Sequence, residues 1–273
     1  MQNLNNKEYA KSIVKQVRRV GDGVVLWLTI ALVVISLIFV MFLGKGPADL
    51  IFNACVIFGV LGFSLFAVRL YQINYLGNAL RVQNGRHSFL RDIANKISRD
   101  LDMPQVDVFI SQNPFLNAFA IGYIKPYTIV LHSAIVEELT QQEVTSIIAH
   151  EMGHIKLKHT WVSAYVNPLA VLVPFLGPVI GWIFGFWGRR AELAADRVAV
   201  AYTRNPHTVV SALTKVYVGS KFAEYMGEEG IAFQQKMSHG LMKLMAQSTA
   251  SHPFLTTRGY EAIRFAQKLG IKV

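Results

Sequence analysis

Residues 143–159 read EVTSIIAHEMGHIKLKH and contain the pattern His-Glu-x-x-His. Thr140 and Glu143 stand at the spacing of a capping box in front of an apolar run, which predicts a helix that begins near Thr140. Residues four apart on a helix project from the same face, so His150 and His154 lie side by side. Two imidazoles at this spacing can bind one Zn²⁺ ion, and the segment therefore predicts a metal-binding helix.

A second helical segment supplies a suitable third ligand. Residues 189–196 read RRAELAAD. Glu192 can complete a His₂Glu site, and Asp196, one turn later, can fix the tautomer of a ligating histidine. Glu151 lies between the two histidines and can act as a general base toward a zinc-bound water. The alternative is a surface helix that carries an acidic pair four residues apart.

Four motifs together resemble the M48 membrane metallopeptidases, a family that includes the HtpX heat-shock proteases and the Ste24 CAAX proteases. The resemblance extends over about residues 70–265 and is strongest to the HtpX-like members. The motifs are His150-Glu151-x-x-His154, Arg189-x-x-Glu192-x-x-Ala195-Asp196, Asn117-Ala118-Phe119-Ala120, and Ser251-His252-Pro253 followed by Arg258.

The resemblance implies a zincin-like domain of the gluzincin type, with one Zn²⁺ per chain. It assigns His150, His154 and Glu192 as the metal ligands and Glu151 as the catalytic base. It also implies that His252 stabilises the oxyanion of the tetrahedral intermediate, a role that a hydrogen-bond donor near the metal can fill.

Two further roles follow from the same resemblance. Arg258 is expected to brace the site, and Asp196 is the acidic partner we suggest for it. Residues Asn117–Ala120 are expected to bind substrate. An exposed sheet edge can hold an extended peptide through backbone hydrogen bonds, which is the geometry that a protease needs.

The composition is typical of a membrane protein. Of the 273 residues, 52% are hydrophobic and 16% are charged, against about 25% charged in soluble domains. Residues 24–43 and 50–68 contain no charged residue, and a short loop with Gly44, Gly46 and Pro47 joins them. About 20 helical residues span the hydrocarbon core of a bilayer. The pattern predicts a transmembrane helical hairpin over residues 24–68.

The predicted organisation has three parts: a basic N-terminal segment (1–23), the transmembrane hairpin (24–68) and a metallopeptidase domain (69–273). The formal net charge is +10, and basic residues precede the first span and follow the second. The positive-inside rule then predicts that the N-terminus and the catalytic domain face the cytoplasm. We expect an integral protein of a bacterial inner membrane.

Residues 161–187 form a third apolar stretch, with 27 residues and no charge. His154 and Glu192 can meet at one metal ion only if both ends of this stretch lie on the same side of the membrane. Two complete crossings need about 40 residues. We therefore predict a helical hairpin that enters the membrane and turns near Pro174–Pro178, because proline and glycine interrupt helices.

The remaining pattern predicts a mainly α-helical fold with a small antiparallel β-sheet. Residues 70–103 are expected to form one helix. Alternating apolar residues predict a strand over 105–110, and residues 117–123 and 127–131 are expected to form a β-hairpin.

The predicted function is a membrane-anchored zinc metalloendopeptidase that cleaves membrane-associated, misfolded or small peptide substrates. One alternative is a non-catalytic, zinc-stabilised membrane scaffold or sensor, although such a protein would not need Glu151. A second is a CAAX-type processing protease, which the short chain disfavours.

Other partners follow from composition and spacing. The bilayer is a predicted partner and nucleic acid is not, because the positive charge is dispersed and lies beside membrane spans. A homo-oligomer is left open. We predict that none of the remaining histidines binds the metal. His87, His207 and His239 have no metal-ligand spacing, His132 follows a predicted strand, and His159 is expected at the membrane interface before Trp161.

Overall fold

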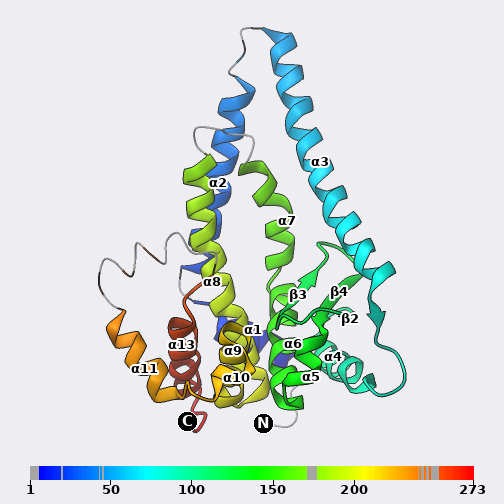
Figure 1. The fold of residues 1–273 in the computed structure, drawn as a ribbon. Coiled ribbons are helices and arrows are strands. Elements are labelled where there is room, and N and C mark those ends of the chain that lie inside the picture. Colours follow the sequence, from blue (N-terminus) through cyan, green and yellow to red (C-terminus); the bar gives the residue numbers. More distant parts are fainter. Residues whose placement is uncertain are drawn as a thin grey trace.

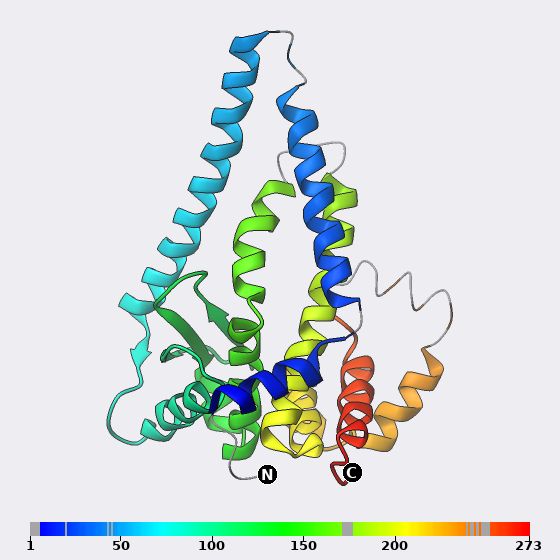
Figure 2. The same cartoon turned by 180° about the vertical axis from the view of Figure 1, so that it is seen from behind.

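The computed structural model describes residues 6–19, 21–42, 44, 46–170, 177–238, 240, 243, 246 and 252–273. This part of the chain is mostly helical and contains one four-stranded sheet. Two long helices, α2 and α3, project from the body of the molecule, whereas the C-terminus lies at the opposite end (Figures 1 and 2).

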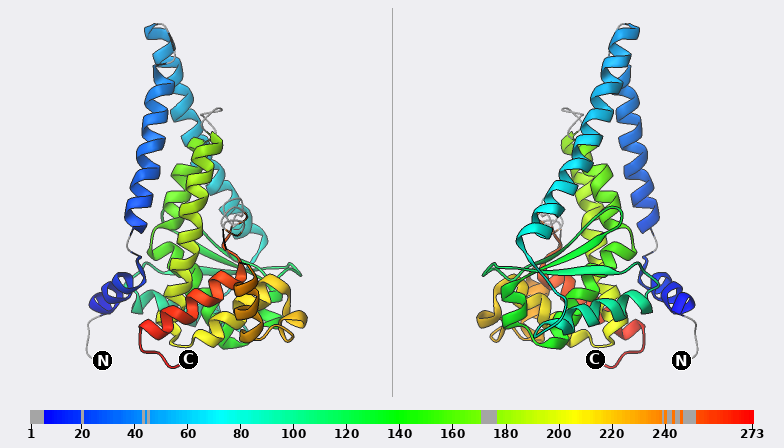
Figure 3. Two further views of the ribbon diagram at one scale, coloured as in Figure 1. Left: turned by 90° about the vertical axis from the view of Figure 1, so that its left-hand side faces the viewer. Right: turned by 90° about the vertical axis from the view of Figure 1, so that its right-hand side faces the viewer.

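Helices α2 (Asp22–Met41) and α3 (Pro47–Asn78) contain the two predicted spans. Both are long and apolar enough to cross a membrane. Large apolar side chains on them face outward, for example Trp27 at 70% exposure and Phe58 at 72%. Helix α3 continues well past the predicted end of the span and reaches the sheet (Figure 3).

Helices α7 (His159–Ala170) and α8 (Gly177–Thr203) contain the third apolar stretch. They pack against each other, α7 beside α3 and α8 beside α2, so that four helices rise together from the body (Figure 1). The predicted bend falls mainly on residues 171–176, which lie outside the described residues. Two helices lie on either side of the predicted turn, and the hairpin's turn and its insertion in a membrane stay predictions.

The prediction of one helix over residues 70–103 is wrong. Helix α3 ends at Asn78, a short strand β1 (Leu80–Arg81) follows, and α4 (Ser88–Asp100) begins after a turn. Gly85 in this turn has a φ of +107°, a backbone conformation that residues with a side chain rarely adopt. The chain therefore reverses where a continuous helix was expected.

The sheet is mixed, so the prediction of an antiparallel sheet is wrong in one strand pair. The strand order is β1-β2-β4-β3, with β2 at Val106–Ser111, β3 at Ala118–Ile121 and β4 at Tyr127–His132. Strands β3 and β4 form the predicted antiparallel hairpin, but β2 pairs with β4 in parallel. The chain crosses from β2 to the far edge of the sheet before it returns as β4, which gives both strands the same direction.

Helix α6 (Gln141–Lys156) lies at the centre of the main core. It packs against the sheet, α4, α8 and α9 (Pro206–Val218), and α13 (Leu255–Lys268) packs in turn against α8 and α9. The remaining helices lie around this core: α1 (Asn6–Val17), α5 (Ser133–Glu138), α10 (Ser220–Ala223) and α11 (Glu228–Met237). The core therefore fixes α6 between the edge strand β3 and helix α8.

Candidate functional site

The start of α6 follows the predicted capping box. The Thr140 side chain accepts a hydrogen bond from the Glu143 backbone N–H, and the Glu143 carboxylate accepts one from the Thr140 backbone N–H. The same carboxylate accepts hydrogen bonds from Ser211 and Lys215 of α9. These contacts fix both the start of α6 and its orientation against α9.

Gly153 allows α6 to approach α8 closely. A Cβ atom at this position would lie 3.1 Å from Cβ of Val198 and 3.3 Å from Cα of Ala195. Both distances are tighter than ordinary van der Waals contact. The absence of a side chain at Gly153 therefore lets α8 bring Glu192 against the two histidines of α6.

The three predicted ligands converge on one point. Nε2 of His150 lies 3.1 Å from Nε2 of His154, and the Glu192 carboxylate lies 3.6 Å from the former and 3.4 Å from the latter. Ligands about 2.05 Å from a tetrahedral metal are about 3.3 Å apart. The donor set therefore fits a zinc ion, with two nitrogens and one carboxylate oxygen as its ligands.

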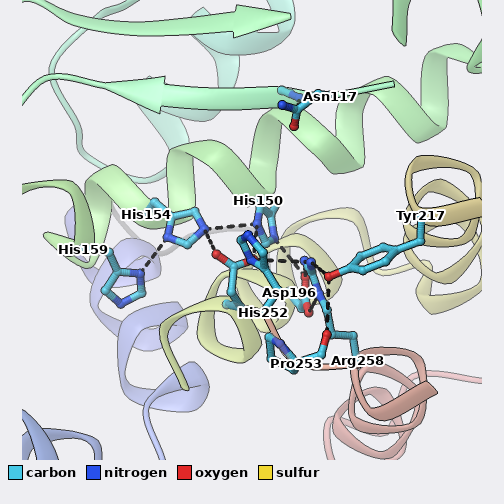
Figure 4. A network of polar contacts seen from close by, with 11 residues as sticks. Asn117, His150, His154, His159, Asp196, Tyr217, His252, Pro253 and Arg258 are labelled. Atoms are coloured by element: carbon cyan, nitrogen blue, oxygen red, sulfur yellow. Dashed lines mark hydrogen bonds and ion pairs between the residues drawn. The ribbon is translucent and has the colours of Figure 1, made fainter. Parts of the chain in front are cut away.

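Asp196 and Arg258 make polar contacts with two of the three donor residues, His150 and Glu192 (Figure 4). Nδ1 of His150 lies 2.9 Å from an Asp196 carboxylate oxygen. Arg258 donates two hydrogen bonds to Asp196, at 2.8 and 2.6 Å, and its Nη1 lies 3.3 Å from Glu192. The suggested pairing of Asp196 with Arg258 is therefore present, and it is almost completely buried.

Tyr217, on α9, is a further member of this network that the sequence did not indicate. Its hydroxyl lies 3.3 Å from Nη1 of Arg258 and can accept a hydrogen bond from it. The guanidinium also lies over the Tyr217 ring, 5.7 Å from its centroid. Tyr217 therefore covers the Arg258 side chain on the cavity side.

His159 lies beside the donor set, a position that no pattern in the sequence predicts. Its Nδ1 lies 3.0 Å from Nδ1 of His154 (Figure 4). Its ring also meets the Trp187 ring edge to face. Burial lowers the pKa of His159 well below its usual value, so the ring is neutral near pH 7. When His154 donates from Nδ1 to His159, Nε2 of His154 keeps a lone pair for a metal ion.

Glu151 is buried beside the donor set and next to the edge strand. Burial raises the pKa of Glu151 to about 7, whereas the neighbouring His150 and the backbone N–H of Ala120 favour its charged form. Such a carboxyl group can both accept and release a proton near neutral pH, as a general base must.

The carboxylates set the charge of the ligands. Burial disfavours the charged form of His150, but the hydrogen-bonding carboxylates of Asp196 and Glu192 outweigh it and raise its pKa to about 10. Burial lowers the pKa of His154 to about 4. The nearby histidines and Arg258 hold the pKa of Glu192 well below its usual range against the effect of burial. Glu192 is therefore deprotonated, as a carboxylate ligand of a metal must be.

His252 lies at the rim of the site. Its side chain is 57% exposed, and its Nδ1 lies 3.7 Å from the Glu192 carboxylate. A hydrogen bond from His252 to Glu192 raises the pKa of His252. The preceding Ser251 of the motif lies outside the described residues. His252 is thus within reach of the cavity and is held less firmly than the buried ligands.

A cavity of about 910 Å³ joins these groups to the edge strand. It is lined by residues Asn117–Ala120 on one side and by His150, Glu151 and Glu192 on the other. In Figure 4, Asn117 lies above the ligand network, and no dashed line joins it to that network. Asn117 directly precedes β3. The cavity also reaches α3, α7 and α8, next to the four projecting helices.

Comparison with known proteins identifies the domain. Residues 81–184 match the profile of peptidase family M48, a range that contains β3, the His-Glu-x-x-His helix and α7. These residues form a peptidase M48 domain. Glu192, His252 and Arg258 lie outside the matched range, and the geometry described above connects them to it.

Two curated relatives and one solved structure are similar to the chain over most of its length. The plastoglobule-localized metallopeptidase 48 of Arabidopsis thaliana is 29% identical over 72% of the chain and 62% of its own length. The protease HtpX of Pseudoalteromonas atlantica is 26% identical over 80% of the chain and 82% of its own length. The crystal structure of S. mikatae Ste24p shares the fold, with a TM-score of 0.52 and 15% identity over 88% of this chain and 62% of Ste24p.

The position of His159 in the M48 domain gives a prediction about metal affinity. Replacing His159 with leucine removes the acceptor at Nδ1 of His154, and such a change beside a metal ligand typically weakens metal binding about 10- to 100-fold. Asn places an oxygen where His159 has Nδ1, so His159→Asn is expected to recover most of the affinity. Zinc retention against a competing chelator measures the effect.

His87→Leu is the control for this measurement, because His87 lies at the start of α4 and not in the site cavity. Equal zinc affinity in the wild type and in His159→Leu would show that His159 does not orient His154.

Proposed function

We propose that this protein is a membrane-anchored zinc metalloendopeptidase that hydrolyses peptide bonds of membrane-associated, misfolded or small peptide substrates. One observation carries the proposal. The metal-binding group His150, His154 and Glu192, whose donor atoms lie within 4.8 Å of one another, lines the same cavity as Glu151 and the edge strand β3. Ligands, base and a peptide-binding edge are the three parts that a metallopeptidase needs.

The metal ligands, Glu151 and His252 each have a separate role in the proposed hydrolysis. A zinc ion held by His150, His154 and Glu192 would supply a Lewis acid for the reaction. Glu151 takes a proton from the attacking water and delivers it to the leaving amine. His252, at the rim, donates a hydrogen bond to the oxyanion as the carbonyl becomes tetrahedral.

The scaffold alternative is less well supported by the geometry. A structural zinc site is closed by four protein ligands, whereas the group here has three and opens into a large cavity. A stabilising site also has no use for a buried carboxyl group beside the ligands whose pKa is about 7. Both features favour catalysis.

The proposal includes an orientation in the membrane. Helices α2 and α3 would cross the bilayer. The basic residues that precede the first span and follow the second would hold the N-terminus and the catalytic domain in the cytoplasm of a bacterial cell. The lipid-facing side chains of both helices are exposed and apolar, which supports this part of the proposal. The cavity would then open close to the membrane surface.

Metal analysis tests the proposed function. The purified chain is expected to bind about one zinc per molecule and to cleave casein. The variant His150→Ala/His154→Ala is expected to lose both the metal and the activity, because no two-nitrogen donor set is left. The variant His87→Ala is the matched control. Full zinc occupancy in the double variant would refute the ligand assignment.

The edge strand gives a separate prediction about substrate binding. The backbone N–H of Ala120 is directed at Glu151, and alternation along the strand directs the N–H of Ala118 to the same edge, where it donates to Oδ1 of Asn117 until a substrate carbonyl replaces that acceptor. The Ala118→Pro variant removes this donor. One lost hydrogen bond is worth about 0.5–1.5 kcal/mol, so kcat/KM for peptides is expected to fall roughly two- to tenfold with zinc retained.

The control for the strand experiment is Ala118→Val, which keeps the N–H and is well tolerated in strands. Steady-state kinetics on one fluorogenic peptide compares the two variants. If Ala118→Pro cleaves the peptide as fast as Ala118→Val does, the substrate does not pair with β3 at this position.

A further inference from the structure

A second cavity, of about 560 Å³, lies where the linker between α1 and α2 meets α8 and α13. Five basic side chains line it: Arg18, Arg19, Arg197, Arg264 and Lys268. Glu261 is the acidic residue among the lining residues. The cavity is separate from the candidate active site, although Arg197 directly follows Asp196 and Glu261 lies one turn after Arg258.

The positive charge in this basic pocket exceeds what its carboxylate can neutralise. Arg19 and Arg197 both donate to the same oxygen of Glu261, and Arg264 approaches the other oxygen. The nearby Asp22 is engaged by Arg190 at 2.6 Å. Several guanidinium groups thus share one carboxylate, an arrangement that leaves a strong preference for an additional anion.

Two buried donors in the pocket are also without a partner. The Nε atoms of Arg19 and Arg197 are shielded from solvent and make no hydrogen bond to any described residue. Burial and the charge of Arg19 both lower the pKa of Arg197, so its charge is held in an unfavourable environment. A buried donor without an acceptor is unfavourable, and a bound anion would supply the missing acceptor.

The pocket lies next to the predicted membrane surface. Arg18 and Arg19 immediately precede α2, which begins at Asp22 and is the first candidate span. Side chains just outside a span meet the headgroup region of the bilayer, where anionic lipids attract basic residues. Arginine matches a phosphate group especially well, because its planar fork donates two parallel hydrogen bonds.

We propose that this basic pocket binds a phosphate group, carried by the headgroup of an anionic phospholipid. The phosphate accepts hydrogen bonds from Arg19 and Arg197 at the bottom of the pocket, and the exposed Arg18, Arg264 and Lys268 surround it. The bound lipid joins the linker before α2 to α8 and α13, the two helices that supply Glu192 and Arg258. It therefore stabilises the folded catalytic domain.

The experiment uses the full chain in a zwitterionic detergent at constant ionic strength. Short-chain phosphatidylglycerol, short-chain phosphatidylcholine and inorganic phosphate are titrated separately, and the midpoint of thermal unfolding is followed. A ligand that binds only the folded state raises this midpoint in proportion to its saturation, which yields an apparent Kd. We expect phosphatidylglycerol to raise the midpoint and phosphatidylcholine to leave it unchanged.

Variants locate the effect in the basic pocket. The Arg19→Gln/Arg197→Gln variant is expected to raise the apparent Kd for phosphatidylglycerol at least about tenfold. If this variant folds poorly, Arg18→Gln/Arg264→Gln/Lys268→Gln changes only exposed side chains and is expected to weaken binding in the same direction. Lys15→Gln is the matched control, because Lys15 is an exposed residue of α1 outside the pocket.

The outcomes separate the alternatives. If inorganic phosphate alone reproduces the shift, the pocket binds phosphate and its source is soluble. If the wild type and both pocket variants titrate identically with phosphatidylglycerol, or if phosphatidylcholine acts equally well, the proposal is wrong. Peptidase activity is not part of the measurement, so its result is independent of the proposed function.

Discussion

The Glu151→Gln variant is expected to keep its fold and its metal but to lose peptidase activity about 10²- to 10⁴-fold. Glutamine has nearly the same shape as glutamate and can still accept the Ala120 N–H, so the packing of α6 against β3 is preserved. It cannot take up a proton from water, which is the step assigned to Glu151. Zinc content and kcat on the same preparation measure the two properties separately.

Glu137→Gln is the control for this experiment, because Glu137 is an exposed residue of α5. It is expected to have wild-type kinetics. If Glu151→Gln cleaves casein at the wild-type rate, Glu151 is not the base and the mechanism proposed here fails, even if the zinc site is correct.

Replacing Arg258 with methionine is expected to destabilise the folded protein by about 3–5 kcal/mol. The guanidinium donates two hydrogen bonds to Asp196, and the side chains of the two residues are 6% and 2% exposed. The variant leaves Asp196 and Glu192 as buried carboxylates without their cationic partner. Chemical denaturation of the purified protein, with the free energy of unfolding as the readout, tests this expectation.

Two further variants make the stability experiment specific. Arg264→Met removes an exposed arginine from the same helix and is expected to change stability by less than about 0.5 kcal/mol. Arg258→Lys keeps the charge without the two parallel hydrogen bonds, so an intermediate loss is expected. If Arg258→Met is as stable as Arg264→Met, the buried ion pair does not hold α13 against α8.

The parts of the site that were predicted from sequence depend on short-range rules. The start of α6 at Thr140 follows from a capping box, and the shared face of His150 and His154 follows from helical spacing. Glu192 and Asp196 share one face of a second helix for the same reason. These inferences need only the local geometry of a helix, whereas the assignment of Glu192 to the same metal site as the histidines rests on the family resemblance.

The inferences that failed depend on how distant segments pack. The direction of β2 relative to β4 depends on the path of the chain between the two strands. Alternation of apolar residues carries no information about that path. The contact of His159 with His154 was not predicted either, because Lys156 and Lys158 before it and Trp161 after it favour a position at the membrane interface. His159 reaches His154 through a tight turn in which Lys158 has a φ of +63°, and a turn of this kind has no clear sequence signal.

Gly153 changes how much information the five-residue motif contains. In its general form the motif leaves two positions free, and many unrelated helices satisfy it by chance. In this molecule one of those positions touches the backbone of α8 at Ala195, so a bulky residue there would keep both histidines and push the third ligand out of reach. A search of protein sequences for this type of centre would therefore gain selectivity by requiring a small residue immediately before the second histidine.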